Sequence, residues 1–110
     1  MRCSDKGDKE LGMKFDQGKP LWRLLPWIAV KAVVAVLTFG ALKYAPNNWL
    51  YVKNADERYI DAALRHLTAY MSGEKNDSET GLNHLAHCIC CLLFLLHFDE
   101  TGERPYLEEK

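Results

Sequence analysis

Residues 76–98 read NDSETGLNHLAHCICCLLFLLHF, and this stretch decides what kind of fold the chain can form. On a helical wheel of ~100° per residue, its first half separates an apolar side from a polar side. Beyond Cys88 the polar side becomes apolar as well. We therefore expect a helix from about Asn76, where Glu79 follows three residues later, to Phe98. Because it is apolar all round, it should lie in the middle of a bundle or at a dimer interface.

Residues 27–43 predict another helix. They follow Pro26 and contain no turn signal except Gly40, and their length favours a mostly buried helix over a strand. Residues 44–52 contain a proline and paired asparagines, which indicate a loop.

A third helix is expected from Asn54 to about Ser72, with Gly73 after its end. Glu57 stands three residues after Asn54, as in a capping box. Its expected apolar face consists of Ile60, Leu64, Leu67 and Met71. The sequence therefore predicts an all-α fold: a small bundle of three main helices with an extended N-terminal arm, completed by oligomerisation because 110 residues provide only a modest core.

Composition excludes several classes of function. A net charge of -1 gives no basic surface for duplex nucleic acid. The longest apolar stretch is interrupted by Lys31 and is shorter than the ~20 residues that cross a bilayer, so we expect no membrane span. Residues 1–11 have no secretory pattern. Three cysteines lie in an apolar helix, where we expect buried small side chains in a reduced, cytoplasmic setting.

The glycine-rich stretch GMKFDQGKP, residues 12–20, is not a phosphate-binding P-loop. Five residues separate its glycines instead of four, Pro20 replaces the hydroxyl residue, and no strand precedes it. It is a loop carrying Lys14, Asp16 and Lys19. This loop either caps the bundle or reaches a phosphate.

A group of acids and histidines is the strongest candidate site. Residues 74–87 contain Glu74, Asp77, Glu79, His84 and His87, and the preceding helix adds Asp61, Arg65 and His66. Carboxylates and imidazoles together can hold a divalent metal or act as a base on water. Alternatively, the acids cap the helix and the histidines form hydrogen bonds in the core.

The choice of metal depends on the ligands. An oxygen set suits Mg²⁺ or Mn²⁺, whereas Zn²⁺ would need two histidines, a carboxylate and an open position. Phosphate chemistry favours the oxygen set, which comprises Asp61, Glu74, Asp77 and Glu79.

A third cluster, Lys43-Tyr44 with Asn48-Trp49, combines a cation, an amide and aromatic rings. Such a group can stack on a nucleobase and bind it by hydrogen bonds. Trp49 can equally close the end of the bundle as an apolar plug.

Taken in order, these motifs resemble a phage family. They are Gly12-x-Lys14-x-Asp16-x-Gly18-Lys19-Pro20, Leu24-Leu25-Pro26, Gly40, Lys43-Tyr44, Asn48-Trp49, Arg58, Ala62-Ala63-x-Arg65-His66, Gly73-Glu74, Asp77-x-Glu79-x-Gly81 and His84-x-x-His87. The pattern resembles the dATP/dGTP diphosphohydrolase N-terminal domain family. More distantly, it is similar to MazG-type all-α NTP pyrophosphatases, although the preceding helix offers only Glu57 and Asp61 in place of their paired acids.

The resemblance implies hydrolysis of purine dNTPs to monophosphate and pyrophosphate with a divalent metal, for which we expect Mg²⁺ or Mn²⁺. From the residues themselves we expect a catalytic group of His66, Glu79, His84 and His87. The expected metal ligands are Asp61, Glu74, Asp77 and Glu79. The implied substrate contacts are Lys14, Asp16, Lys19, Lys43, Tyr44, Asn48, Trp49, Arg58 and Arg65.

The domain organisation that follows is a tail over residues 1–11, a helical nucleotide-binding domain over residues 12–98 and a tail over residues 99–110. Expected partners are a purine nucleotide and further copies of the chain, in the cytoplasm of a host bacterium. The alternative function is nucleotide binding without catalysis, as in a phage sponge that sequesters a host defence signal. A structural interaction protein is a third possibility.

Overall fold

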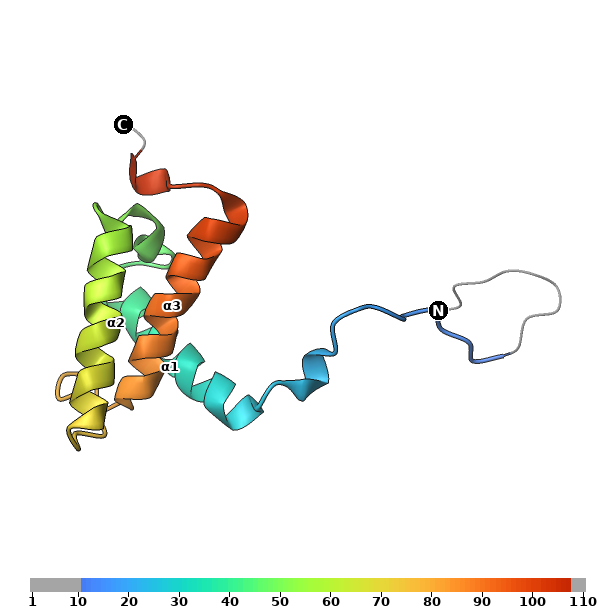
Figure 1. The fold of residues 1–110 in the computed structure, drawn as a ribbon, viewed down its shortest axis with the longest axis horizontal. Helices are drawn as coiled ribbons and strands as arrows, with labels where there is room; N and C mark the ends of the chain where they lie inside the picture. Colours follow the sequence, from blue (N-terminus) through green and yellow to red (C-terminus); the bar gives the residue numbers. More distant parts are fainter. Residues whose placement is uncertain (1–10, 108–110) are drawn as a thin grey trace.

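The computed structural model describes residues 11–107, and its fold is all-α, as predicted (Figure 1). The main helices are α1 (Trp27–Lys43), α2 (Ala55–Met71) and α3 (His84–Thr101). Three short 3₁₀ helices, η1 (Trp22–Leu24), η2 (Asn48–Tyr51) and η3 (Pro105–Leu107), lie before, between and after them. Within the described residues there is no strand, only an isolated bridge between Asn76 and Asn83. The predicted tail of residues 1–11 lies outside this part of the chain except for Leu11.

Helix α3 packs against both other helices, which confirms its predicted central position. On one side Ala86 and Cys90 meet Val33 of α1, and on the other Cys88 and Cys91 meet Ala63 of α2. Two sides of α3 are apolar because they contact α1 and α2, whereas Leu92 and Leu96 on the remaining surface are about half exposed. The cysteines are free and buried, as expected.

Helix α1 has the predicted bounds but is not mostly buried. Only Val33 is buried, whereas Ile28 is 90% exposed and Leu42 is 84% exposed. The reason is that α1 contacts α3 along one side, and no other element of the described chain covers the rest. Residues 11–26 form the extended arm and project away from the bundle (Figure 1).

Helix α2 also has the predicted bounds, but two details were wrong. The side chain of Asn54 makes no capping hydrogen bond, because this residue has a left-handed backbone with φ of 58°. The expected apolar face is largely exposed, with Leu64 at 54% and Met71 at 73%. The face that packs on α3 is built on Ala63, with Tyr59, Ala62 and Leu67 beside it, and the small alanines let the two helices approach closely.

Helix α3 begins at His84, not at Asn76. Gly81 has φ of +73°, a left-handed conformation that interrupts a helix, and the Asp77 carboxylate accepts hydrogen bonds from the backbone of the loop. Asn83 takes the capping role, accepting a hydrogen bond of 2.7 Å from the backbone N–H of Leu85. Residues 72–83 are therefore a loop that lies beside the start of α3.

The other end of α3 is tied to α2 by Arg104. Its Nε donates to Asp56 at the start of α2 over 3.1 Å, and another guanidinium nitrogen donates to the Phe98 carbonyl over 2.8 Å. Helix α3 continues to Thr101, beyond the predicted Phe98, and the chain then folds back through η3.

Candidate functional site

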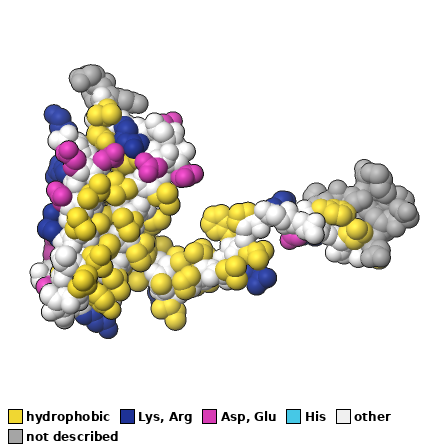
Figure 2. Space-filling model, viewed as in Figure 1, with side chains coloured by type: hydrophobic (Ala, Val, Ile, Leu, Met, Phe, Trp, Pro, Cys, Tyr) yellow, Lys and Arg dark blue, Asp and Glu magenta, His cyan; other side chains and the backbone are white. Residues whose placement is uncertain are grey.

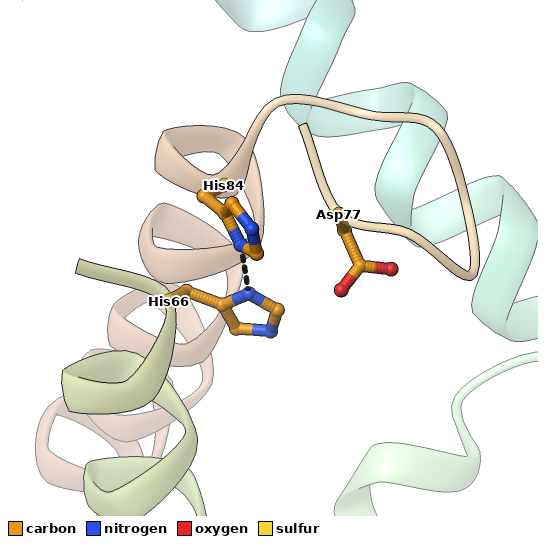
Figure 3. Close-up of side chains that lie close together, drawn as sticks. All are labelled: His66, Asp77 and His84. Atoms are coloured by element: carbon orange, nitrogen blue, oxygen red, sulfur yellow. Dashed lines mark hydrogen bonds between the residues drawn. The ribbon is translucent and has the colours of Figure 1, made fainter. Parts of the chain in front are cut away.

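Three of the predicted site residues converge where α2, α3 and the loop meet. His66 comes from α2, His84 from α3 and Asp77 from the loop over residues 72–83 (Figure 3). One side-chain nitrogen or oxygen of each lies within 4.8 Å of the others, and the Nδ1 atoms of His66 and His84 are 2.8 Å apart. This distance is a hydrogen bond, in which one imidazole donates and the other accepts.

His84 is the most deeply placed member of the cluster. Its exposed fraction is 5%, and its Nε2 has no hydrogen-bond partner among the described residues. The Oε2 of Glu74 lies 3.2 Å from this nitrogen, but the direction of approach does not make a hydrogen bond. The Glu74 side chain is 55% exposed, so solvent reaches this carboxylate.

Asp77 is held by its own loop. Its Oδ2 accepts hydrogen bonds from the backbone N–H groups of Glu79 and Thr80, both at 3.0 Å. The Thr80 hydroxyl lies 3.3 Å from the same oxygen and 2.8 Å from Nε2 of His87. Asp77 and His87 are thus joined through one hydroxyl group.

His87 adds a third imidazole to the site. Its ring stacks on that of His66, with centroids 4.5 Å apart and planes inclined by 12°. Burial lowers the pKa of His66, and the neighbouring histidines lower this pKa further. Burial also lowers the pKa of His87, although the Asp77 carboxylate opposes that shift. Both rings are therefore mainly neutral at pH 7 and offer a lone pair.

The Asp77 carboxyl is ionised under the same conditions. Burial on its own would raise its pKa, but the hydrogen bonds from Thr80 and Glu79, with His87 nearby, outweigh burial and lower the pKa. The site therefore combines an anionic oxygen with neutral imidazole nitrogens, which are the forms that bind cations.

An ion pair links the site to α1. Nζ of Lys43 lies 2.6 Å from Oε2 of Glu79, and this hydrogen bond raises the pKa of Lys43. The same Nζ lies 5.2 Å from the centre of the Tyr44 ring. Lys43 and Tyr44 of one predicted motif therefore lie close to Glu79 of another.

A cavity of about 840 Å³ opens next to this pair. The second half of α1, the loop with η2 and the middle of α3 line it, mostly with apolar side chains; Tyr44, Asn48 and Trp49 are in the wall. His87 also lines the cavity, so the cavity and the histidine cluster share a residue. This volume is typical of sites for small ligands.

Trp49 serves the fold rather than presenting a free stacking face. Its ring lies on that of Phe94, with centroids 4.4 Å apart and planes inclined by 11°, and His97 meets it edge-on. This packing agrees with the alternative interpretation of Trp49, in which the ring closes the end of the bundle as an apolar plug.

Several predicted residues are not brought to the cluster. Asp61 and Arg58 are exposed on α2, and Arg58 lies within reach of the Lys53 carbonyl. Arg65 is exposed too, but its charge acts on His66. The arm residues Lys14, Asp16 and Lys19 are exposed and lie away from the helices (Figure 1).

Thr80 is the site residue that sequence reasoning missed. The stretch Asp-Ser-Glu-Thr-Gly is typical of a turn closed by an aspartate side chain. Reading it as a turn rather than a helix start would have placed the Thr80 hydroxyl beside Asp77.

The chain matches the family described as dATP/dGTP diphosphohydrolase, N-terminal, over residues 9–105. It belongs to this family. The match includes the cluster, the cavity and the arm residues Lys14 to Lys19, so all candidate residues of the chain lie within it.

A relative from Salmonella phage PMBT28 carries the name dATP/dGTP diphosphohydrolase. It is 39% identical to the present domain over 99 residues, which cover 90% of this chain and 33% of the phage protein. The chain thus spans about a third of that relative's length. No solved structure matches the domain significantly, and no helix of the described residues is long and apolar enough to cross a membrane.

Proposed function

We propose that this domain hydrolyses purine dNTPs, dATP and dGTP, to monophosphate and pyrophosphate with the help of a divalent cation. The observation that carries the proposal is the convergence of His66, Asp77 and His84 within 4.8 Å, beside a cavity large enough for a nucleoside. Membership of the family and the name of the phage relative support the same reaction.

The chain's own residues have distinct roles in this proposal. The cluster holds the cation, whose charge offsets that of the phosphates. His87, neutral and bonded to Thr80, accepts a proton from the attacking water. Lys43, once released from Glu79, binds a phosphate. Arg65 is next to His66 on α2, where its charge acts on His66, and adds positive charge.

The base is proposed to enter the apolar cavity. Tyr44 and Asn48 are in its wall, where an aromatic ring and an amide can recognise a purine by stacking and hydrogen bonding. The arm residues Lys14, Asp16 and Lys19 contribute only if the arm folds back onto the bundle.

The test is hydrolysis of each dNTP by the purified protein with Mg²⁺, Mn²⁺ or Zn²⁺, with products separated by anion-exchange chromatography. We expect dAMP, dGMP and pyrophosphate, and a loss of rate of at least tenfold in His87→Gln. Glu57→Gln, an exposed change at the start of α2, is the control and should keep the wild-type rate. Intact purine dNTPs with all three cations would refute the proposal.

Nucleotide binding without hydrolysis is the second candidate. It is favoured by one observation: the chain corresponds to 33% of the relative, so catalysis named for that protein can belong to its other part. A phage sponge of this kind needs no metal. Calorimetry with a nucleotide distinguishes the two, because sequestration gives tight binding that EDTA does not change and leaves the nucleotide intact.

We also propose that the domain forms a homodimer. Apolar residues on α2 and α3 repeat at alternating steps of four and three, which is the spacing that packs helices side by side. We call this surface the α2–α3 face; it comprises Ile60, Leu64, Leu67, Met71, Leu85, Ile89, Leu92 and Leu96. Figure 2 shows apolar side chains covering the molecule over α2 and α3, on the side where α1 does not cover them.

The size of this face fits a second copy as its occupant. Six of its side chains are 42–73% exposed. Together the face exposes roughly 700 Å², close to the ~800 Å² that each partner contributes to a standard interface. Two antiparallel helix pairs joined through it complete a four-helix bundle, which gives both copies the core that one chain lacks.

The phage relative also suggests a location. We propose that the domain acts in the cytoplasm of an infected bacterium, where the dNTP pool is found.

A further inference from the structure

The donor atoms of the cluster differ from those expected for magnesium. The three side chains that converge in the described part of the chain are two imidazoles and one carboxylate, from His66, His84 and Asp77. Two of the predicted oxygen ligands are elsewhere: Asp61 is exposed on α2, and Glu79 is engaged in an ion pair. The oxygen set deduced from the sequence is therefore not assembled.

This donor set favours a different class of cation. Mg²⁺ is bound through carboxylates, phosphates and waters in octahedral geometry, whereas imidazole nitrogens suit first-row transition ions. Two histidines and one carboxylate with an open fourth position are the ligands of catalytic zinc sites. We propose that His66, Asp77 and His84 bind a transition cation of the zinc class and that Mg²⁺ does not occupy this site. The inference deepens the proposed function by naming the cation of the same site.

The geometry requires only a small movement. Zinc–nitrogen bonds of about 2.0–2.1 Å in a tetrahedral site hold the two nitrogens about 3.3 Å apart. The Nδ1 atoms of His66 and His84 are 2.8 Å apart, at hydrogen-bond distance. A cation would therefore take the place of the proton between the rings, that proton would move by exchange with solvent to Nε2 of the same ring, and the rings would separate by about half an ångström.

The surroundings already orient the ligands. Backbone N–H groups and the Thr80 hydroxyl fix the carboxylate of Asp77. His84 is nine-tenths buried with an unpartnered Nε2, and the Glu74 carboxylate stands 3.2 Å from it. In metal sites the second nitrogen of a ligating histidine commonly donates to such a carboxylate, which fixes the ring and makes it a better ligand. Without a cation, a buried polar atom in this position is costly.

Charge also favours a cation. Asp77 and Glu74 bring two carboxylates to the imidazoles of the cluster, while Glu79 and Lys43 neutralise each other. Arg65 is the nearby positive charge on α2, and it is exposed to solvent. The centre of the cluster is therefore electronegative.

The test measures metal binding without nucleotide. Protein stripped with EDTA is titrated with Zn²⁺, Co²⁺ and Mg²⁺ by calorimetry, and the Co²⁺ complex is followed by its visible absorption. All proteins carry Cys3→Ser, since Cys3 lies outside the described residues and a free thiol is itself a zinc ligand. We expect one Zn²⁺ or Co²⁺ per chain, a Co²⁺ spectrum of low coordination number with nitrogen ligands, and no heat with Mg²⁺.

Variants assign the site. His66→Gln should weaken Zn²⁺ binding at least 100-fold, and Glu74→Gln should weaken it 10- to 100-fold, as outer-shell partners do. His97→Gln removes an exposed histidine outside the cluster and should bind as the wild type does. Far-ultraviolet circular dichroism of each variant verifies folding. His84→Gln should weaken Zn²⁺ binding as His66→Gln does. His84 is buried, so if His84→Gln does not fold, the result for His66→Gln decides, because His66 is only half-buried on α2.

The outcomes separate this inference from the proposed function. Zinc bound equally by wild type and His66→Gln, or heat with Mg²⁺ that His66→Gln abolishes, would overturn the inference even if dNTPs are hydrolysed. Zinc bound at the cluster by a protein that leaves every dNTP intact would uphold the metal site and refute the hydrolase.

Discussion

At the scale of single residues, Asp77 links the stability of the loop to the site. Its carboxylate accepts hydrogen bonds from two backbone N–H groups and approaches the Thr80 hydroxyl, and it belongs to the cluster with His66. No other described side chain combines these contacts. Both the shape of the loop and the charge of the site therefore depend on one carboxyl group.

We predict that Asp77→Ala lowers the free energy of unfolding by about 1–3 kcal/mol, because the N–H groups of Glu79 and Thr80 lose an ionised acceptor. Urea denaturation measures the change. Asp61→Ala, an exposed carboxylate on α2, should change stability by less than about 0.5 kcal/mol. Equal effects of the two substitutions would contradict the role assigned to Asp77.

At the scale of elements, we predict that replacing two different glycines by alanine changes stability in opposite directions. Gly40 lies inside α1, where a Cβ would meet nothing within 4 Å, whereas Gly81 has φ of +73° in the loop before α3. Gly40→Ala should stabilise by about 0.5–1 kcal/mol, since alanine restricts the unfolded chain and favours the helix. Gly81→Ala should destabilise by about 1–2 kcal/mol, the cost of a left-handed alanine.

Thermal unfolding of the two variants checks the signs. A rise of the melting temperature for Gly81→Ala would mean that the loop has another backbone conformation. A fall for Gly40→Ala would mean that α1 is covered at this position in solution.

The folded protein should lose stability at alkaline pH because of buried groups in α3 and on the helix that faces it. Burial raises the pKa of Cys90 to about 12 and that of Cys91 to about 11, from 9.0. Burial also raises the pKa of Tyr59, on the facing helix, to about 12. Above pH 9 the unfolded chain releases these protons first, so it binds fewer protons than the folded chain and gains stability relative to it.

The contribution of these thiols to the free energy of unfolding should therefore be constant below about pH 9 and should fall as the pH rises from 9.0 toward 12, with a slope of up to ~1.4 kcal/mol per pH unit for each thiol. Urea denaturation in a pH series measures the slope. Cys90→Ala should start from a lower stability, since a buried side chain is shortened, but fall less steeply. Identical slopes would show that Cys90 is not protected.

At the scale of the whole molecule, the α2–α3 face gives a prediction about association. A leucine replaced by glutamate in its centre would place a charge in the dimer interface, so Leu64→Glu and Leu92→Glu should each be monomeric while the wild type has the mass of two chains. Light scattering after size exclusion measures these masses. Leu107→Glu changes an exposed leucine outside the face and should remain dimeric.

A wild type that is monomeric at every concentration would refute the dimer. A dimer that survives Leu64→Glu and Leu92→Glu would place the interface elsewhere, for instance on the exposed tryptophans Trp22, in the arm, and Trp27, at the start of α1.

Much of the helical framework was predictable because its causes are local. Pro26 starts α1 and Gly73 follows α2, and both helices have the predicted bounds. The start of α3 was not predicted correctly. Asn76 and Glu79 have the spacing of a helix start, but Asp77 and Gly81 form a turn there. Two local patterns competed, and the backbone of the loop favoured the turn.

For the candidate site, too, the residues could be predicted from the sequence but their contacts could not. Spacing along the chain predicted the acids and histidines as a candidate site, and periodicity predicted the central position of α3, because both depend on neighbours in sequence. Packing alone decided that His66 meets His84, that Glu79 pairs with Lys43 and that Asp61 points to solvent. These contacts join different elements, so they depend on how closely the small side chains of α2 let it approach α3, which the pattern of either helix alone does not specify.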